Sequence, residues 1–383
     1  MAALKVAIPK ERRAHERRVA ATPETVKKMT GLGLAVAVES GAGTAATYLD
    51  DAYRAAGATV GDAAATLVGA NVVLKVQRPL DKAEGTDELA GIPRGALLIG
   101  LLDPLAHPEQ VAAYARAGVT AFAMELVPRI SRAQTMDALS SQANLAGYKA
   151  VLDAAEVFGK AMPLMMTAAG TIAPARVFVL GAGVAGLQAI ATARRLGAVV
   201  SATDVRRAAF EQVESLGATF IAPPEIADAE TKGGYAKELD KDAQARQAAT
   251  VAAHLKKQDI AITTALIPGR KAPLLITAEM VAGMKPGSVI VDLAVEQGGN
   301  VALSKPGEIV EVGGVKIIGH RNVPSRIAVD ASALYARNLL AFLTPLLSKS
   351  GELAINWDDE IVKGTLLTRD GAVVNERLAK PAA

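Results

Sequence analysis

Short apolar runs alternate with amphipathic segments along the first 125 residues. The run KVAIP predicts a strand, and PETVKKMTG, with Pro at its start and Gly at its end, predicts the helix that follows. Such alternation is typical of a parallel sheet with helices on both faces. The expected strands cover residues 5–9, 35–40, 71–76, 95–100 and 119–125, and the expected helices cover 23–31 and 50–57.

A second strand–helix series begins at residue 176. Its expected strands are 176–180, 198–203, 259–264, 288–294 and 315–318, and its expected helices are 184–196 and 206–217. A helix at 331–347 is followed by a mixed tail that we expect to pack back on the first series. We therefore predict an α/β chain with two Rossmann-like, doubly wound parallel-sheet domains and a cleft between them. The predicted domains are residues 1–136 with about 330–383, and residues 137–329, which form the NAD(H)-binding domain.

Residues 137–160 predict one long helix that joins the two series. Steps of four, three and four residues place Asp137, Ser141, Asn144 and Tyr148 on one face of it. Ligands of such folds bind in the crevice between β/α units, so this face is a candidate site wall.

Composition narrows the function classes. The 383 residues suggest two or three domains, and 51% hydrophobic residues suffice for large cores. The absence of cysteine excludes disulfides, thiol catalysis and Cys-ligated metals. No two of the four histidines have the spacing of a metal site, so we expect none. With 42 basic and 39 acidic residues, scattered, and 3% aromatics, a nucleic-acid binder is disfavoured.

The mean hydropathy of +0.25 requires a check for membrane spans. Residues 161–175 and 177–193 are uncharged, but both stretches fall short of about 18–20 residues and contain Gly, Pro or Gln. We expect no direct membrane insertion. The polar stretch 222–240, with a Pro pair and a Gly pair, is interpreted as a surface loop.

The most specific local pattern is Gly181-Ala-Gly183-Val-Ala-Gly186, which follows an apolar strand and opens a helix. Gly181 permits the tight turn, Gly183 lets the backbone approach a pyrophosphate, and Gly186 lets the helix pack close to the strand. The N-terminus of the helix then offers free N–H groups to phosphates. The alternative is a Gly-rich turn without a ligand.

Asp204 ends the next expected strand, 18 residues after Gly186. A carboxylate there accepts hydrogen bonds from ribose hydroxyls and repels a 2′-phosphate, which favours NAD over NADP. Arg206 and Arg207 lie close by and weaken that preference, because arginine accommodates the phosphate.

A polar cluster ends the first series. It consists of Arg129, Arg132, Gln134, Asp137, Ser140 and Ser141. Two interpretations stay open, a site in the crevice and a charged helix cap with Asp137 as N-cap. General acid/base candidates are few, because His15, His107, His254 and His320 are all expected in surface or structural roles.

Several segments resemble the NAD(H)-binding component, domain I or the alpha-1 subunit, of proton-translocating nicotinamide nucleotide transhydrogenase, within the wider alanine dehydrogenase/transhydrogenase family. They span residues 5 to 345 and are 9–24, 74–79, 124–148, 167–198, 233–238, 263–273 and 322–326. The resemblance implies a Re/Si-specific NAD(P) transhydrogenase that passes hydride between NADH and NADP(H) bound on a partner.

The resemblance also implies site residues. Gln134 would bridge toward the second nucleotide, Arg129, Asp137 and Ser140 would orient the nicotinamide, and Tyr235 would close over it. The implied cofactor-binding residues are Gly181, Ala182, Gly183, Val184, Gly186, Asp204, Val205, Arg206, Ser141, Asn144, Tyr235, Thr264, Ala265 and Leu266. Hydride transfer between two nicotinamides neither creates nor consumes a proton at the rings, which suits a site without an acid/base group.

The implied partners are a second copy of the chain, a membrane-bound beta subunit and a small membrane alpha-2 subunit. The implied location is cytoplasmic, peripheral on the inner face of a bacterial membrane. The alternative is an alanine or related amino-acid dehydrogenase. Arg18 and Lys75 match its carboxylate-binding residues, but Leu102 stands near the place of its catalytic histidine, and His107 is five residues further on.

Overall fold

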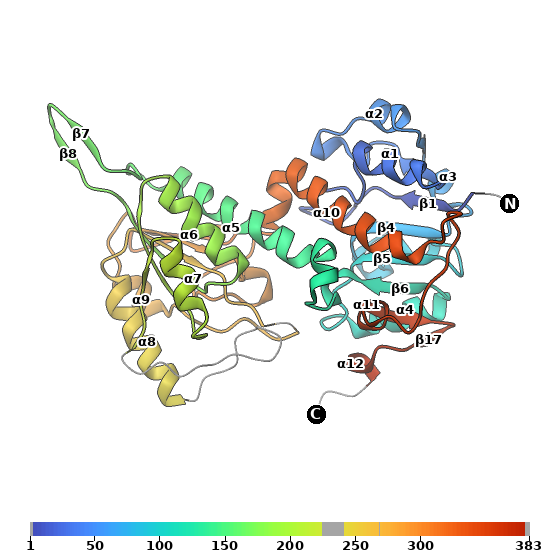
Figure 1. The fold of residues 1–383 in the computed structure, drawn as a ribbon. Coiled ribbons are helices and arrows are strands. Elements are labelled where there is room, and N and C mark those ends of the chain that lie inside the picture. The colour runs from blue at the N-terminus through green and yellow to red at the C-terminus, as the bar shows by residue number, and fades with distance from the viewer. Residues whose placement is uncertain (1–2, 224–240, 268, 380–383) are drawn as a thin grey trace. The chain divides into compact units, whose positions relative to one another are not determined.

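The computed structural model describes residues 3–223, 241–267 and 269–379. The chain divides into two compact units, Met1–Gln142 with Ser325–Ala383, and Ala143–Pro324. Each unit contains one large β-sheet flanked by helices. In Figure 1 the C-terminal segment, coloured orange to red, lies among the blue and cyan elements of the first unit. The predicted α/β fold class is confirmed.

The sheet of the first unit is parallel except at one edge. Pairing is parallel from β1 to β6, whereas two strands from the C-terminal segment pair antiparallel at the edge, which the prediction of a parallel sheet missed. In sheet order the strands are β17 (Ala372–Val373), β16 (Leu366–Arg369), β6 (Thr120–Ala123), β5 (Leu97–Leu101), β4 (Val72–Gln77), β1 (Lys5–Ile8), β2 (Ala35–Glu39) and β3 (Thr59–Gly61).

Two apolar layers cover the faces of this sheet because successive strand residues point to opposite sides. Val6 and Ile8 belong to the layer with the first and tenth helices, and Ala7 belongs to the layer with the fourth. The helices are α1 (Pro23–Gly31), α2 (Asp50–Ala55), α3 (Ala63–Leu67), α4 (Pro108–Ala117), α10 (Ala328–Leu343), α11 (Glu360–Thr365) and α12 (Glu376–Ala379). Short 3₁₀ helices include η4 (Met124–Leu126) and η5 (Ser131–Met136).

The sheet of the second unit repeats the pattern. Its strands are, in sheet order, β11 (Thr219–Phe220), β10 (Val199–Thr203), β9 (Arg176–Leu180), β12 (Ile260–Thr263), β13 (Val289–Asp292), β15 (Val315–Ile318) and the antiparallel edge strand β14 (Ile309–Val312). Its helices are α6 (Val184–Arg195), α7 (Ala209–Ser215), α8 (Lys241–Leu255), α9 (Ala278–Ala282) and α5 (Ala138–Val157), which begins in the first unit. Val177 and Val179 pack with α6, and Phe178 and Leu180 with α8.

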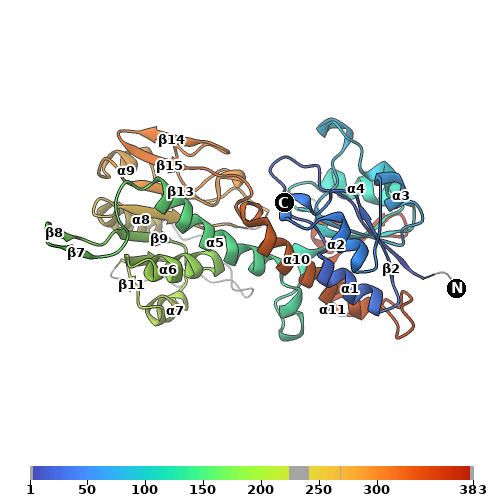
Figure 2. The ribbon, with the colours of Figure 1, turned by 90° about the horizontal axis from the view of Figure 1, so that it is seen from above.

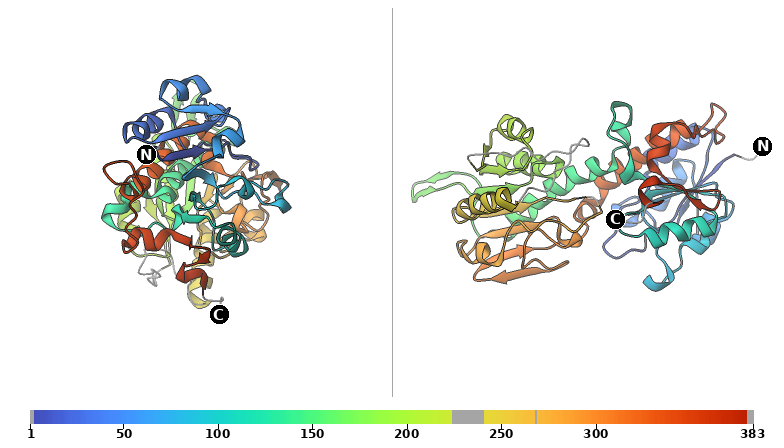
Figure 3. Two further views of the ribbon diagram at one scale, coloured as in Figure 1. Left: turned by 90° about the vertical axis from the view of Figure 1, so that its right-hand side faces the viewer. Right: turned by 90° about the horizontal axis from the view of Figure 1, so that it is seen from below.

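A two-stranded hairpin, β7 (Met165–Thr167) and β8 (Gly170–Ile172), stands clear of the rest of the second unit (Figures 2 and 3). The sequence pattern did not predict it. It occupies the uncharged stretch 161–175 that had required a membrane check. None of the described helices is both long and apolar enough to cross a membrane.

Candidate nucleotide site

The loops that follow β9, β10 and β12 meet at one edge of the second sheet. The Gly181 N–H donates to the Thr203 carbonyl at 2.8 Å, and the Thr264 N–H donates to the Leu180 carbonyl at 2.9 Å. The Thr264 hydroxyl donates to the Gly181 carbonyl at 3.0 Å. Because the chain leaves β9 in one direction toward β10 and later returns on its other side as β12, this edge is a switch point, where open α/β sheets bind ligands.

The three glycines of the turn differ in the space around them. Gly181 has φ +100, and a Cβ there would lie 2.6 Å from the Thr264 hydroxyl. A Cβ on Gly186 would lie 1.8 Å from the Gly181 carbonyl oxygen. A Cβ on Gly183 would meet no atom closer than 4.0 Å, the nearest being Nη2 of Arg206. Gly181 and Gly186 are therefore required by the protein's own packing, whereas the space above Gly183 is open.

Asp204 is held as an anion next to this open space. Its carboxylate accepts hydrogen bonds from the Ala182 N–H at 2.7 Å and from the Arg206 N–H, Nε and Nη2 at 2.8, 2.9 and 2.9 Å. Burial opposes ionisation of Asp204, but these donors and the Arg206 charge offset it, so the pKa of Asp204 is lowered. The carboxylate is thus ionised at neutral pH and suited to accept hydroxyl groups.

Asp204→Asn is expected to weaken NADH binding by about tenfold and to narrow the preference for NADH over NADPH, because the negative charge that repels a 2′-phosphate is lost. Titrations of both nucleotides by calorimetry measure the two constants. Asp259→Asn is a matched control, because Asp259 accepts the Arg176 N–H at 2.9 Å where β9 begins, at the opposite edge of the sheet. An unchanged NADH constant for Asp204→Asn, or an equal loss in the control, contradicts the assignment.

The other predicted cofactor residues of this unit lie on the same loops or beside them. Val184 and Leu266 are exposed, and Val205 and Ala265 are partly buried. The Asn144 amide donates to Gln188 of α6 at 3.2 Å, so α5 lies against the helix that the Gly-rich turn opens. Tyr235 lies outside the described residues.

A polar segment of the first unit carries the predicted catalytic residues. In η5, Ala133 and Met136 are buried at 1% and 7% exposure, so Gln134 between them is directed outward and is exposed. Arg129 precedes η5 and is also exposed.

Asp137 and Ser140 form a helix cap. The Asp137 carboxylate accepts the Ser140 N–H at 2.8 Å and the Ser140 hydroxyl at 2.6 Å, which satisfies the first turn of α5. The cap interpretation of this segment is therefore realised in the structure, and the role of both residues in orienting a nicotinamide stays a prediction. Ser141 differs, because its hydroxyl donates to the side-chain oxygen of Asn338 in α10 at 2.7 Å.

Two histidines lie in structural surroundings. His107 precedes α4 and contacts Glu109 at 3.3 Å. His254 of α8 contacts the Ser201 hydroxyl at 2.8 Å and the edge of Phe178, and its burial lowers its pKa. Within the described ranges, no three His, Asp or Glu side chains gather as metal ligands. The groups at the two polar loops can bind and orient a ligand through amides, a carboxylate, guanidinium and hydroxyl groups.

Comparison with known proteins gives the family. Residues 7–146 match "Alanine dehydrogenase/PNT, N-terminal domain" and residues 150–376 match "Alanine dehydrogenase/PNT, C-terminal domain". The chain belongs to the alanine dehydrogenase/PNT family. The resemblance stated from the sequence is confirmed.

Members of the alanine dehydrogenase/PNT family match this chain over nearly its whole length. The first of the separately encoded pieces of NAD(P) transhydrogenase subunit alpha from Rhodospirillum rubrum is 60% identical over 384 residues, covering 99% of this chain and 100% of that one. The crystal structure of transhydrogenase from Sinorhizobium meliloti is 56% identical, with a TM-score of 0.87, covering 97% of this chain and 100% of that one. A structure of L-alanine dehydrogenase is 26% identical, with a TM-score of 0.79, covering 98% of both chains.

The two cations that match alanine dehydrogenase are paired inside the first unit of this family member. Arg18 is 4% exposed, and its Nε and Nη2 donate to Glu16 at 2.8 and 2.7 Å. Lys75 is 2% exposed, and its Nζ lies 3.3 Å from Glu11 and 3.2 Å from Glu88. Both positive charges are thus compensated by carboxylates of the chain itself.

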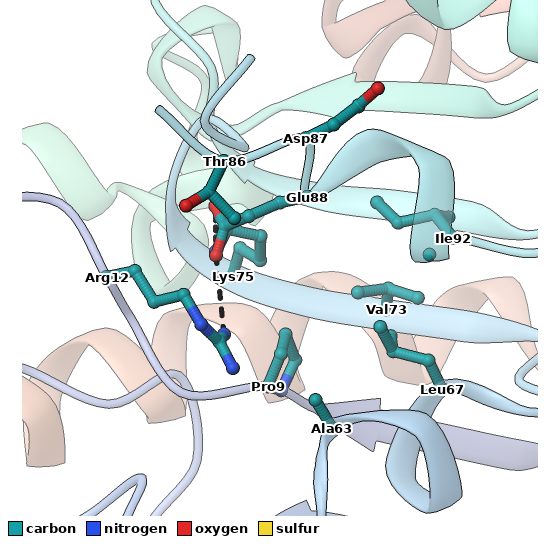
Figure 4. A pocket seen from close by; sticks show the side chains of 11 residues that line it. Pro9, Arg12, Ala63, Leu67, Val73, Lys75, Thr86, Asp87, Glu88 and Ile92 are labelled. Atoms are coloured by element: carbon teal, nitrogen blue, oxygen red, sulfur yellow. Dashed lines mark hydrogen bonds and ion pairs between the residues drawn. The ribbon is translucent and has the colours of Figure 1, made fainter. Parts of the chain in front are cut away.

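Lys75 and Glu88 also line a cavity of about 200 Å³ (Figure 4). Most of the other side chains on its wall are apolar, among them Leu67, Val73 and Ile92. Burial raises the pKa of Glu11, which reaches Lys75 from the loop after β1. The ion pairs agree with a structural role for Arg18 and Lys75.

Sequence reasoning missed a buried amide behind the nucleotide loops. Asn300 is fully buried; its Oδ1 accepts the Ala265 N–H at 3.0 Å, and its Nδ2 donates to the Ala265 and Pro273 carbonyls at 2.9 and 2.7 Å. It therefore fixes the loop after β12. Its only signal in the sequence is a Gly-Gly-Asn turn, which says nothing of the partners.

Proposed function

We propose that the chain is the NAD(H)-binding subunit of a proton-translocating NAD(P) transhydrogenase, and that it passes hydride between NADH and NADP⁺ bound on a partner beta subunit. The observation that carries the proposal is the switch-point edge of the second sheet, where the open space above Gly183 lies beside the ionised Asp204. The likeness to transhydrogenase subunits over the whole chain supports it.

The residues present suit a dinucleotide. The open space at Gly183 and the N-terminus of the twelve-residue helix α6 would receive the pyrophosphate, and Asp204 would accept the adenosine ribose hydroxyls. Thr264, Ala265 and Leu266 would line the same edge. When bound, NADH supplies the hydride, and the chain's residues bind and orient the nucleotide.

The remaining chemistry is positioning. Gln134, Arg129, Asp137 and Ser140 would orient the nicotinamide through amide, guanidinium, carboxylate and hydroxyl groups. A reaction between two nicotinamides needs close C4 atoms, correct orientation and excluded water, and no general acid or base. The ion-paired Arg18 and Lys75 add no open cation for a small carboxylate substrate.

The test uses the purified chain with and without an NADP-bearing partner subunit. We expect NADH binding by the chain alone, no NADH oxidation with pyruvate and ammonia, and rapid transfer to NADP⁺ once the partner is added. Vigorous pyruvate-plus-ammonia reduction by the chain alone would instead establish the amino-acid dehydrogenase. Nucleotide binding without transfer to any partner would make it a sensor.

The proposal includes an assembly. The subunit would act as a homodimer at the cytoplasmic face of a bacterial inner membrane, bound to the membrane-embedded beta subunit and a small alpha-2 subunit. The names of the relatives as subunit alpha support a complex with other subunits. Neither nucleic acid nor direct insertion in the membrane has a role in it.

The hairpin β7–β8 supplies a surface for the second copy. Leu164, Met165, Met166 and Ile172 are 55%, 44%, 79% and 43% exposed. An isolated two-stranded hairpin is marginal in water, and exposed apolar clusters mark interfaces. Symmetric dimers are the commonest oligomers, so we assign the hairpin to the dimer contact.

Met166→Asp is expected to convert the dimer to a monomer at micromolar concentration, because the new charge would be buried in the contact. Light scattering after gel filtration measures the mass. Val68→Asp is the control, because Val68 is 69% exposed in the first unit and away from the hairpin. A dimer that survives Met166→Asp, or a wild-type monomer, removes the hairpin from this role.

A further inference from the structure

Helix α10 presents three polar side chains that bond to the ends of three other segments of the first unit. Ser332, Tyr335 and Asn338 are 0%, 0% and 7% exposed and follow one another at three-residue spacing, so they share one face. The Ser332 hydroxyl accepts the Val19 N–H at 3.0 Å, and the Tyr335 hydroxyl donates to the Lys75 carbonyl at 2.9 Å. Two of these contacts therefore fix the loop after β1 and the strand β4.

Asn338 holds the polar segment instead. Its Nδ2 donates to the Thr135 carbonyl at 2.8 Å, and its Oδ1 accepts the Ser141 hydroxyl at 2.7 Å. Thr135 directly follows Gln134, and Ser141 directly follows Ser140. One buried amide thus joins the end of η5 to the first turn of α5.

Apolar packing alone does not fix the orientation of this segment. Ala133 and Met136 belong to the same core cluster as Leu339 and Phe342 of α10. Hydrophobic contact is not directional, whereas a hydrogen bond constrains both distance and angle. An amide that donates at one end and accepts at the other fixes the rotation of the backbone that carries Gln134.

We propose that Asn338 is a positioning residue that sets the placement of Gln134, Asp137 and Ser140 for hydride transfer. The inference rests on the proposed function. It gives Asn338 no contact with substrate: its effect passes through the Thr135 carbonyl and the Ser141 hydroxyl. A displacement of about 1 Å in such a segment costs on the order of 100-fold in rate.

The test compares Asn338→Leu and Asn338→Asp with Ser332→Ala, a control on the same face of α10 that contacts a different loop. For Asn338→Leu we expect transfer with the partner to fall on the order of 100-fold. The NADH dissociation constant should change less than about threefold. Amide hydrogen exchange in peptides covering 131–141 should be faster. Ser332→Ala should leave exchange in 131–141 and the transfer rate close to wild type.

Asn338→Asp adds a pH readout that a merely structural role would not give. A neutral carboxyl can still donate to the Thr135 carbonyl and accept from Ser141, whereas the ionised form repels the carbonyl oxygen. Burial raises the pKa of such a carboxyl, so the transfer rate relative to wild type should recover as the pH falls from 8 to 6, and Asn338→Leu should show no recovery.

Three results overturn the inference: equal losses in Asn338→Leu and Ser332→Ala, unchanged exchange in 131–141, or no pH-dependent recovery in Asn338→Asp. Failure of the proposed function is a separate outcome. If the wild-type chain and its partner transfer no hydride, that function falls, while the exchange measurement still tests whether Asn338 holds the segment.

Discussion

Gln134→Asn is expected to lower hydride transfer on the order of 100-fold, because the amide is retained but its reach shortens by one methylene and the rings lose their approach. The NADH dissociation constant should change less than about threefold, since the nucleotide is held mainly by the Gly-rich turn and Asp204. Gln134 is exposed and lies between the buried Ala133 and Met136, so its shortening leaves the packing of η5 intact. Transfer is measured by stopped flow with the partner, and binding by calorimetry.

The control for this experiment is Thr135→Ala. The Thr135 side chain is exposed, and its carbonyl keeps the bond to Asn338 in the variant. Thr135→Ala should transfer hydride within about twofold of wild type. Equal, small effects of Gln134→Asn on binding and transfer would remove Gln134 from its assigned role.

Much of the fold was predictable because its signals are local. Apolar runs with β-branched residues gave β9 at 176–180, and Pro at the start and Gly at the end gave α1 at 23–31, each with the observed bounds. The Gly-rich turn was found for the same reason, since its three glycines and the following helix lie within one short segment.

Edges and surfaces were less accessible to sequence reasoning. The hairpin β7–β8 is exposed along both strands, so it lacks the alternation that marks a half-buried strand. The strands β16 and β17 are short and pair with β6 from more than 240 residues away, as in the contact between Thr368 and Ala121, whose sequence separation is 247. A pairing at that separation leaves no local pattern.

The buried amides were missed for a related physical reason. Asn338 and Thr135 are 203 residues apart, and Asn300 and Ala265 are 35 apart. An asparagine in an amphipathic helix or after a Gly pair has the same local pattern whether it lies in solvent or holds a distant loop. Asp137 illustrates the opposite case, because its spacing to Ser140 predicted a cap that the structure shows, while its role toward a ligand remains a prediction.

Two glycines of one turn should fail in different ways when each is changed to alanine. For Gly186→Ala, the new Cβ would lie 1.8 Å from the Gly181 carbonyl oxygen and 3.3 Å from the Thr264 hydroxyl. Backbone must move to relieve the first contact, so we expect a loss of about 1–3 kcal/mol of unfolding free energy or more, together with loss of NADH binding. Thermal unfolding and nucleotide titration measure the two effects.

Gly183→Ala should instead separate binding from stability. Its Cβ would meet no protein atom within contact distance, the nearest being Arg206 Nη2 at 4.0 Å, so the unfolding temperature should stay within about 2 °C of wild type. The methyl group would occupy the space through which the backbone approaches the pyrophosphate, so NADH binding should weaken at least about tenfold. Wild-type affinity in a stable Gly183→Ala would mean that the open space above Gly183 faces solvent and not the nucleotide, and the pyrophosphate assignment at this turn would be lost.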